Sequence, residues 1–177
     1  MRINKILLLL IFSLINTEEI PINNSISDKL ILFKPFLGKI FRGKIINSKV
    51  NDSIYNIHRW YSVLNGNAIR MTHEINNGEY LSEAFILWDE KLNRLRSWHF
   101  NSSGIVVIKD VKFVDDNLIF IEDVSKNKNG ITKVKTIYNF TYNGKLQNRT
   151  RFLMDNIWVD GGESIYDELL NTDVVSD

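Results

Sequence analysis

The chain has 177 residues, of which 44% are hydrophobic and 24% are charged, and its formal net charge is +1. This is enough for one domain with a proper core, and a near-neutral chain without a basic run is not expected to bind nucleic acid. The absence of cysteine excludes disulfides, thiolate catalysis, cysteine-based metal sites and a lipid-modified N-terminal cysteine.

The first residues have the pattern of an export signal. Residues 1–5 (MRINK) carry two positive charges, and residues 6–15 are apolar except for Ser13. At about 1.5 Å per residue, this run covers about half of the roughly 30 Å hydrocarbon core, so it is too short for a spanning helix. We predict a signal peptide over residues 1–16 and an exported protein, periplasmic or secreted, with no spanning segment in the mature chain. An uncleaved N-terminal anchor and a buried N-terminal helix remain as alternatives.

Three short segments flank the main part of the chain. Residues 17–27 are polar and contain Pro21, which predicts a linker. Residues 28–36 predict a short helix with Ser27 or Asp28 as its N-cap, and Pro35 near its end keeps it short. The acidic residues 171–177 predict a flexible tail.

After Lys39 the sequence alternates between short apolar segments and tight turns such as Asn65-Gly66, which favours hairpins. No connection is long enough for a crossover helix, so the sheet is antiparallel, and closing it removes both exposed edges. Gly161-Gly162 predicts a bulge in the last strand. We therefore predict one all-β domain over residues 28–170, an up-and-down, calycin-type barrel with a short N-terminal helix. The expected strands, about ten, are residues 39–46, 54–64, 67–75, 79–88, 94–100, 105–113, 118–124, 131–142, 145–154 and 157–166.

Residue alternation predicts which side chains face the interior of this barrel. The predicted inward faces mix apolar with polar residues, which is typical of an interior that holds a ligand or water. These faces are Ile69, Met71, His73 and Ile75; Val134, Thr136, Tyr138, Phe140 and Tyr142; and Leu146, Asn148, Thr150, Phe152 and Met154.

Several short motifs combine aromatic residues with glycine at strand positions. The first two are PFLGKIFRG at residues 35–43 and WYSVLNGNAI at residues 60–69. The third is Trp88-Asp89 followed by Arg94, Trp98, Phe100, Ser102 and Gly104, and the last is Trp158 with Glu163 and Tyr166. Over residues 28–168 this pattern resembles the DUF1579-like group of lipocalin-like bacterial proteins. The resemblance implies a calycin-type barrel and carries no established activity.

A second, more distant resemblance is to the nitrobindin group, ten-stranded barrels that hold haem through a histidine near the C-terminus. This chain has no histidine after His99, so we expect neither haem nor another cofactor.

The three histidines are the main candidates for chemistry. Alternation places His73 and His99 on inward faces and leaves His58 open. Inward histidines can bind a metal or act as acid and base near neutral pH, or they can be hydrogen-bonded wall residues. No His-x-His or His-Glu-x-x-His spacing indicates a metal, so we expect no metal site and assign no catalytic residue.

The leading hypothesis is a barrel that binds a small hydrophobic or amphipathic ligand. One alternative is an envelope interaction or structural protein with a filled barrel, and another is a small barrel enzyme that uses His73 or His99. The sequence indicates neither the ligand nor an oligomeric state. The candidate ligand-binding residues are Trp60, Met71, His73, Trp98, His99, Tyr138 and Phe152.

Overall fold

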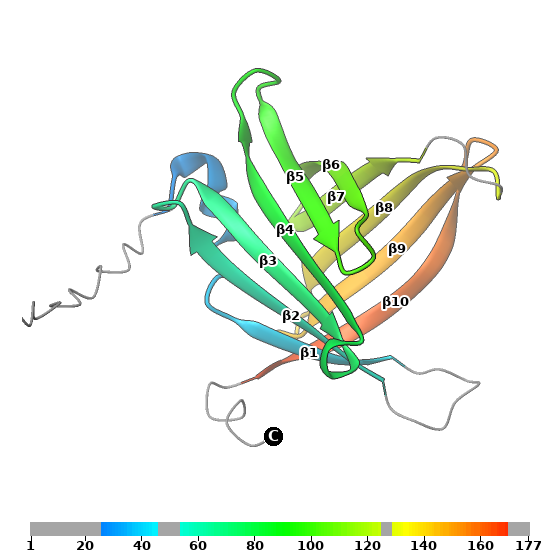
Figure 1. Cartoon of the computed structure of the whole chain (residues 1–177), viewed down its shortest axis with the longest axis horizontal. Helices are drawn as coiled ribbons and strands as arrows, with labels where there is room; N and C mark the ends of the chain where they lie inside the picture. The colour runs from blue at the N-terminus through cyan, green and yellow to red at the C-terminus, as the bar shows by residue number, and fades with distance from the viewer. Residues whose placement is uncertain (1–25, 46–53, 125–128, 170–177) are drawn as a thin grey trace, which may run out of the picture.

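The fold was analysed in a computed structural model that describes residues 26–45, 54–124 and 129–169. These residues form a closed, ten-stranded antiparallel barrel in which each strand pairs with its neighbours in sequence and β1 closes against β10 (Figure 1). The predicted all-β, up-and-down barrel is thus confirmed. The strands are β1 (Ile40–Ile45), β2 (Ile54–Val63), β3 (Ala68–Ile75), β4 (Tyr80–Asp89), β5 (Arg94–Asn101), β6 (Val106–Val114), β7 (Asn117–Asp123), β8 (Ile131–Phe140), β9 (Leu146–Met154) and β10 (Ile157–Leu169).

The turns and irregularities follow from local sequence. Asn65 and Gly66, between β2 and β3, have φ angles of 53° and 83°, which is the left-handed conformation that Asn-Gly tolerates. In β10 the register against β9 shifts between Asp160 and Gly162. This shift is the predicted bulge.

The N-terminal segment covers one end of the barrel, which we call the closed end. Its helix is the 3₁₀ helix η1 (Asp28–Phe33), which contacts β3 and β4 (Figure 1). The helix is shorter than the predicted 28–36. Ser27 is the N-cap residue, but its side chain makes no capping hydrogen bond. Instead, the Ser27 backbone N–H donates to the Gly66 carbonyl at 3.0 Å, which ties the helix to the β2–β3 turn.

Aromatic rings anchor this segment in the barrel mouth. The ring of Phe33 meets Phe113 edge-on at 5.0 Å between centroids. Phe36 lies 4.9 Å from Trp60 and 5.0 Å from Phe140. Burial of a large apolar side chain stabilises a fold by about 1.5–3 kcal/mol, so these rings fix the closed end.

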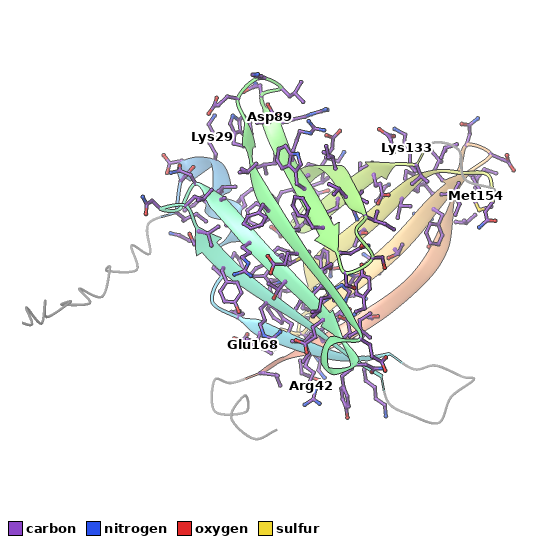
Figure 2. The ribbon with its side chains drawn as sticks, in the orientation of Figure 1. Lys29, Arg42, Asp89, Lys133, Met154 and Glu168 are labelled. Atoms are coloured by element: carbon purple, nitrogen blue, oxygen red, sulfur yellow. The ribbon has the colours of Figure 1, made fainter. Side chains whose placement is uncertain are left out.

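The barrel interior has an apolar half beside η1 and a polar half beyond it. On β2, Trp60 contacts the η1 segment, whereas Asn56 and His58 precede it on the same face and therefore lie farther from η1. Figure 2 labels Lys133 and Met154 at the end of the barrel away from η1. The apolar half consists of Phe41, Trp60, Ile69, Ile86, Leu118 and Leu146, all fully buried.

On β3, β8 and β9 the predicted inward faces contain the buried residues Ile69, Met71, Tyr138 and Leu146, whereas one residue departs from the prediction. Tyr142 was expected on the inward face of its strand, but it is fully exposed. The reason is that β8 ends at Phe140 and the chain has already entered the turn around Gly144.

The predicted signal peptide (residues 1–16), most of the linker (17–27) and the tail (171–177) lie outside the described residues and stay predictions. Within the part of the chain that is described, no helix is long and apolar enough to cross a membrane.

Candidate functional site

The polar half of the interior contains a partly open cavity of about 310 Å³, which is within the usual range for small-molecule sites. Nine of the ten strands contribute to its wall, because each inward face reaches it at mid-barrel. Most of the wall is polar. Alongside histidines and tyrosines it carries the hydroxyls of Ser82, Thr136, Thr150 and Ser164 and the amides of Asn56 and Asn148.

All three histidines of the chain lie on the cavity wall. His58 and His73 are register partners on β2 and β3, and their rings are stacked with centroids 4.4 Å apart and planes 2° apart. His99, on β5, lies with its Nε2 atom 3.1 Å from the Ser97 hydroxyl. Its ring meets Phe120 edge-on. The sequence does not decide whether His58 faces the interior or the outside of the barrel. Its pairing with the inward-facing His73 shows that it faces the interior.

Burial keeps these imidazoles uncharged near neutral pH. It lowers the pKa of His58 well below the ordinary value, with the neighbouring His73 adding to the effect. Burial lowers the pKa of His73 to about 4. The pKa of His99 falls to about 3, through burial first and the Lys109 charge second. A neutral imidazole offers one donor and one acceptor, so the three rings form a neutral hydrogen-bonding surface.

Two tyrosines, Tyr138 and Tyr166, meet the His58 ring edge-on at 5.9 and 5.0 Å. Burial raises the pKa of both Tyr138 and Tyr166, so both hydroxyls stay protonated. Asn56 donates a hydrogen bond from Nδ2 to the Tyr166 hydroxyl at 2.8 Å, and Asn148 is the hydrogen-bond partner of Tyr138. These pairs fix the rings across β2, β8, β9 and β10.

Several polar atoms around the cavity are buried without a protein partner. They are both ring nitrogens of His58, the Nε2 atom of His73 and the Oδ1 atom of Asn56. A buried polar group left unpaired costs about 1–3 kcal/mol, so natural proteins satisfy such atoms with water or a ligand. These atoms are inaccessible within the packed wall, so a guest molecule in the cavity reaches them only if the surrounding rings shift.

Four of the seven predicted site residues line the cavity: Met71, His73, His99 and Tyr138. Trp60 does not, because it is fully buried in the apolar half, with its ring edge-on to Tyr138 at 5.8 Å.

Phe152 is also outside the cavity wall, although it lies on the inward face of β9 as predicted. A side chain at Gly161 would collide with its ring. Phe152 therefore packs against the β10 bulge, which leaves it off the ligand wall.

The structure corrects the prediction for Trp98. Leu95, Ser97 and His99 face inward on β5, so strand alternation places Trp98 on the outer face. There it pairs in register with Phe85 and Ile108, and the Arg96 guanidinium lies 5.6 Å from its ring centroid.

The wall residues that sequence reasoning missed include Asn56, His58, Lys109 and Tyr166. Strand alternation already indicated that Asn56 and His58 face the interior, because they lie four and two residues before Trp60 and therefore on the same face of β2. Lys109 shares the parity of Val107 and Val111, which is an unusual place for a lysine. The functional meaning of these positions appears only once the register aligns the strands.

The arrangement of the wall residues bears on metal binding and on acid–base chemistry. Among the described residues, no three His, Cys, Asp or Glu side chains are grouped to hold a metal ion. The parallel rings of His58 and His73 keep their lone pairs side by side, whereas two ligands of one ion must converge on it. The lining residues include no carboxylate to orient a histidine as a base, and the low pKa values of His73 and His99 make both rings weak bases.

No protein-family model matches the sequence, and no curated protein matches it.

Proposed function

We propose that this protein is an exported, lipocalin-like carrier of the DUF1579-like kind, which binds a small amphipathic molecule inside its barrel. The observation that carries the proposal is the 310 Å³ cavity inside the barrel, with its wall of imidazole, hydroxyl and amide groups around Met71 and Phe120. The kinship is supported by the up-and-down topology and by the N-terminal helix that covers one mouth. Export is supported by the pattern of residues 1–16.

The wall chemistry narrows the ligand from hydrophobic or amphipathic to amphipathic. Met71 and Phe120 supply apolar contact. Around them, imidazole, hydroxyl and amide groups supply donors and acceptors. A purely apolar guest would leave those groups unpaired, at a cost of about 1–3 kcal/mol each. The guest therefore needs both an apolar body and polar atoms.

The volume sets the size of the guest. A water molecule takes up about 30 Å³ of liquid volume, so a 310 Å³ cavity holds a molecule of about ten non-hydrogen atoms. This excludes long-chain lipids and large cofactors as complete occupants of the interior.

The two alternatives fit the interior less well. A structural protein with a filled barrel requires a packed interior, against which the cavity argues. A barrel enzyme that uses His73 or His99 requires a base whose pKa lies near the pH at which the enzyme works. Burial instead lowers the pKa of both rings far below neutrality.

Native mass spectrometry of protein purified without denaturant tests the proposal. We expect a bound small molecule in the native spectrum that is lost on denaturation. Thr136→Phe places a ring in the cavity and should abolish the adduct, whereas the control Lys133→Phe, on the outer face of the same strand, should retain it. A folded protein that carries no adduct and admits none of the small probes named below would overturn the carrier function.

A further inference from the structure

We propose that the ligand of this cavity carries one negative charge, of the carboxylate class, which is held by the ammonium group of Lys109. This inference rests on the proposed carrier function and names the chemistry of its ligand.

The cavity wall has an unbalanced set of charges. Lys109 is the one Lys, Arg, Asp or Glu among the residues that line it. The histidines and tyrosines around it are uncharged, because burial lowers the pKa of the former and raises that of Tyr138 and Tyr166. An anion inside the barrel therefore meets one cation among the lining residues, with the Glu122 carboxylate beside that cation. A charge interaction in such a shielded interior is stronger than in water.

Lys109 is positioned by β6 rather than by a flexible loop. It pairs in register with the fully buried Ser97, and its side chain is only 18% exposed. Its charge acts on His99, whose pKa it helps to lower. Lys109 and His99 thus line the cavity from the neighbouring strands β6 and β5, and Ser97 lies in register with Lys109 and within hydrogen-bond distance of His99.

Glu122, the ion-pair partner of Lys109, is held at a distance that allows the ammonium group to form a shorter contact with a ligand. Glu122 on β7 lies with a carboxylate oxygen 3.4 Å from the Lys109 Nζ atom, whereas charge-assisted hydrogen bonds are usually about 2.7–2.9 Å long. An ammonium has three N–H donors, so it can donate to a ligand carboxylate while Glu122 stays nearby. Glu122 balances the charge of Lys109 when no anion is bound and competes with the anion for it.

A carboxylate fits this group better than a phosphate does. One lysine supplies a single positive charge, and the lining residues include no arginine that could grip two phosphate oxygens at once. A singly charged head with two acceptor oxygens matches one ammonium assisted by neutral donors.

Calorimetric titration with matched pairs of small probes tests the inference at pH 7.5. Benzoate is compared with benzamide, and hexanoate with hexanamide, because each pair shares its shape and differs in charge. Benzylamine supplies the opposite charge. We expect each acid to bind about tenfold or more tightly than its amide, as a charge-assisted hydrogen bond in a shielded site implies, and benzylamine to bind most weakly.

Three variants separate the charge of Lys109 from its packing. Lys109→Met should bring the acid and its amide to equal affinity, and Lys109→Arg, which keeps the charge, should restore the preference. Glu122→Gln removes the competing carboxylate and should tighten acid binding several-fold. The control Lys112→Met, exposed on the outer face of the same strand, should change nothing. If Lys109→Met fails to fold, Glu122→Gln and Lys109→Arg carry the test.

The outcomes distinguish this inference from the carrier function. If amides bind the wild-type protein as tightly as the acids, the barrel is a carrier and the anion inference is wrong. If none of the five probes binds and the purified protein also carries no adduct, the carrier function fails and the inference fails with it; if an adduct is present but no acid probe binds, only the anion inference fails. If Lys109→Met still binds each acid more tightly than its amide, other residues bind the anion and the assignment to Lys109 is overturned.

Discussion

The imidazole rings of His58 and His73 lie face to face across the β2–β3 pair, 4.4 Å apart and within 2° of parallel. Two such rings are compatible while both are neutral, because a proton on either ring would place a charge against its neighbour in a buried site. His99 faces the same cavity from β5. The barrel therefore keeps its three histidines uncharged together, and acid should act on all of them.

Stability should fall as the solution becomes acidic. In the unfolded chain a histidine gains its proton near pH 6.5, whereas in the folded barrel the pKa of His73 is about 4 and that of His99 about 3. Between these values the unfolded state binds more protons, so the free energy of unfolding decreases as pH falls through 6.5 toward 4. From pH 7.5 to 5.5 we expect a loss of roughly 1.4 kcal/mol for each histidine.

Urea unfolding at pH 7.5 and 5.5 measures this loss. The double variant His73→Gln, His99→Gln should show a clearly smaller difference between the two pH values than the wild type. An equal free energy of unfolding at both values in the wild type would show that the histidines are not buried and neutral.

The N-terminal segment that contains η1 should contribute strongly to the stability of the protein. Phe33 is fully buried and contacts Phe36, Trp60 and Phe113. Phe33→Ala should lower the free energy of unfolding by about 3–5 kcal/mol, as for other buried aromatic truncations. Leu32, the preceding residue of η1, is 57% exposed, so Leu32→Ala should change it by less than about 0.5 kcal/mol. Similar losses for the two variants, measured by urea unfolding, would contradict the placement of η1 over the barrel mouth.

A methyl group at Gly43 should disturb the cavity by displacing the ring of Tyr166, which lines it. An added Cβ atom there would lie 2.5 Å from a ring carbon of Tyr166, so the ring must shift and its hydrogen bond with Asn56 must change. Gly43→Ala should destabilise the protein by about 1–3 kcal/mol and weaken benzoate binding. Lys44→Ala, at the exposed neighbouring position, is the matched control. Wild-type stability and affinity in Gly43→Ala would mean that Tyr166 does not pack against β1.

The outward placement of Trp98 can be tested directly. Trp98→Leu should leave the affinity for benzoate unchanged, because the side chain pairs with Phe85 and Ile108 on the outer face. Thr136→Phe, on the inward face of β8, should abolish binding. Calorimetry on both variants decides the point, and a clear loss of affinity in Trp98→Leu would place that ring inside the barrel.

The fold followed from sequence because its signals are local. Turn residues such as Asn65-Gly66 set the strand ends, and alternation set the inward faces of β3, β8 and β9. Alternation also contained the answer for Trp98, whose neighbours Ser97 and His99 face inward. The residue type of Trp98 favours a ligand wall, whereas strand alternation favours the outer face.

The cavity itself could not be predicted, because it depends on contacts between distant parts of the chain. Trp60 is core rather than ligand wall because η1 brings Phe33 and Phe36 against it. His58 and Lys109 became wall residues only through their register with His73 and Ser97. No local pattern shows where along a barrel the apolar packing ends and open space begins.

The most direct test of the central claim, a ligand site inside the barrel, is the ¹⁵N spectrum of the imidazole rings during titration with benzoate at pH 7.5. We predict that the ring nitrogens of all three histidines have the chemical shifts of neutral tautomers and move in a saturable way as benzoate fills the cavity. In Thr136→Phe the same titration should leave them unchanged. Wild-type ring signals that stay constant up to millimolar benzoate and hexanoate would contradict a binding site among these residues.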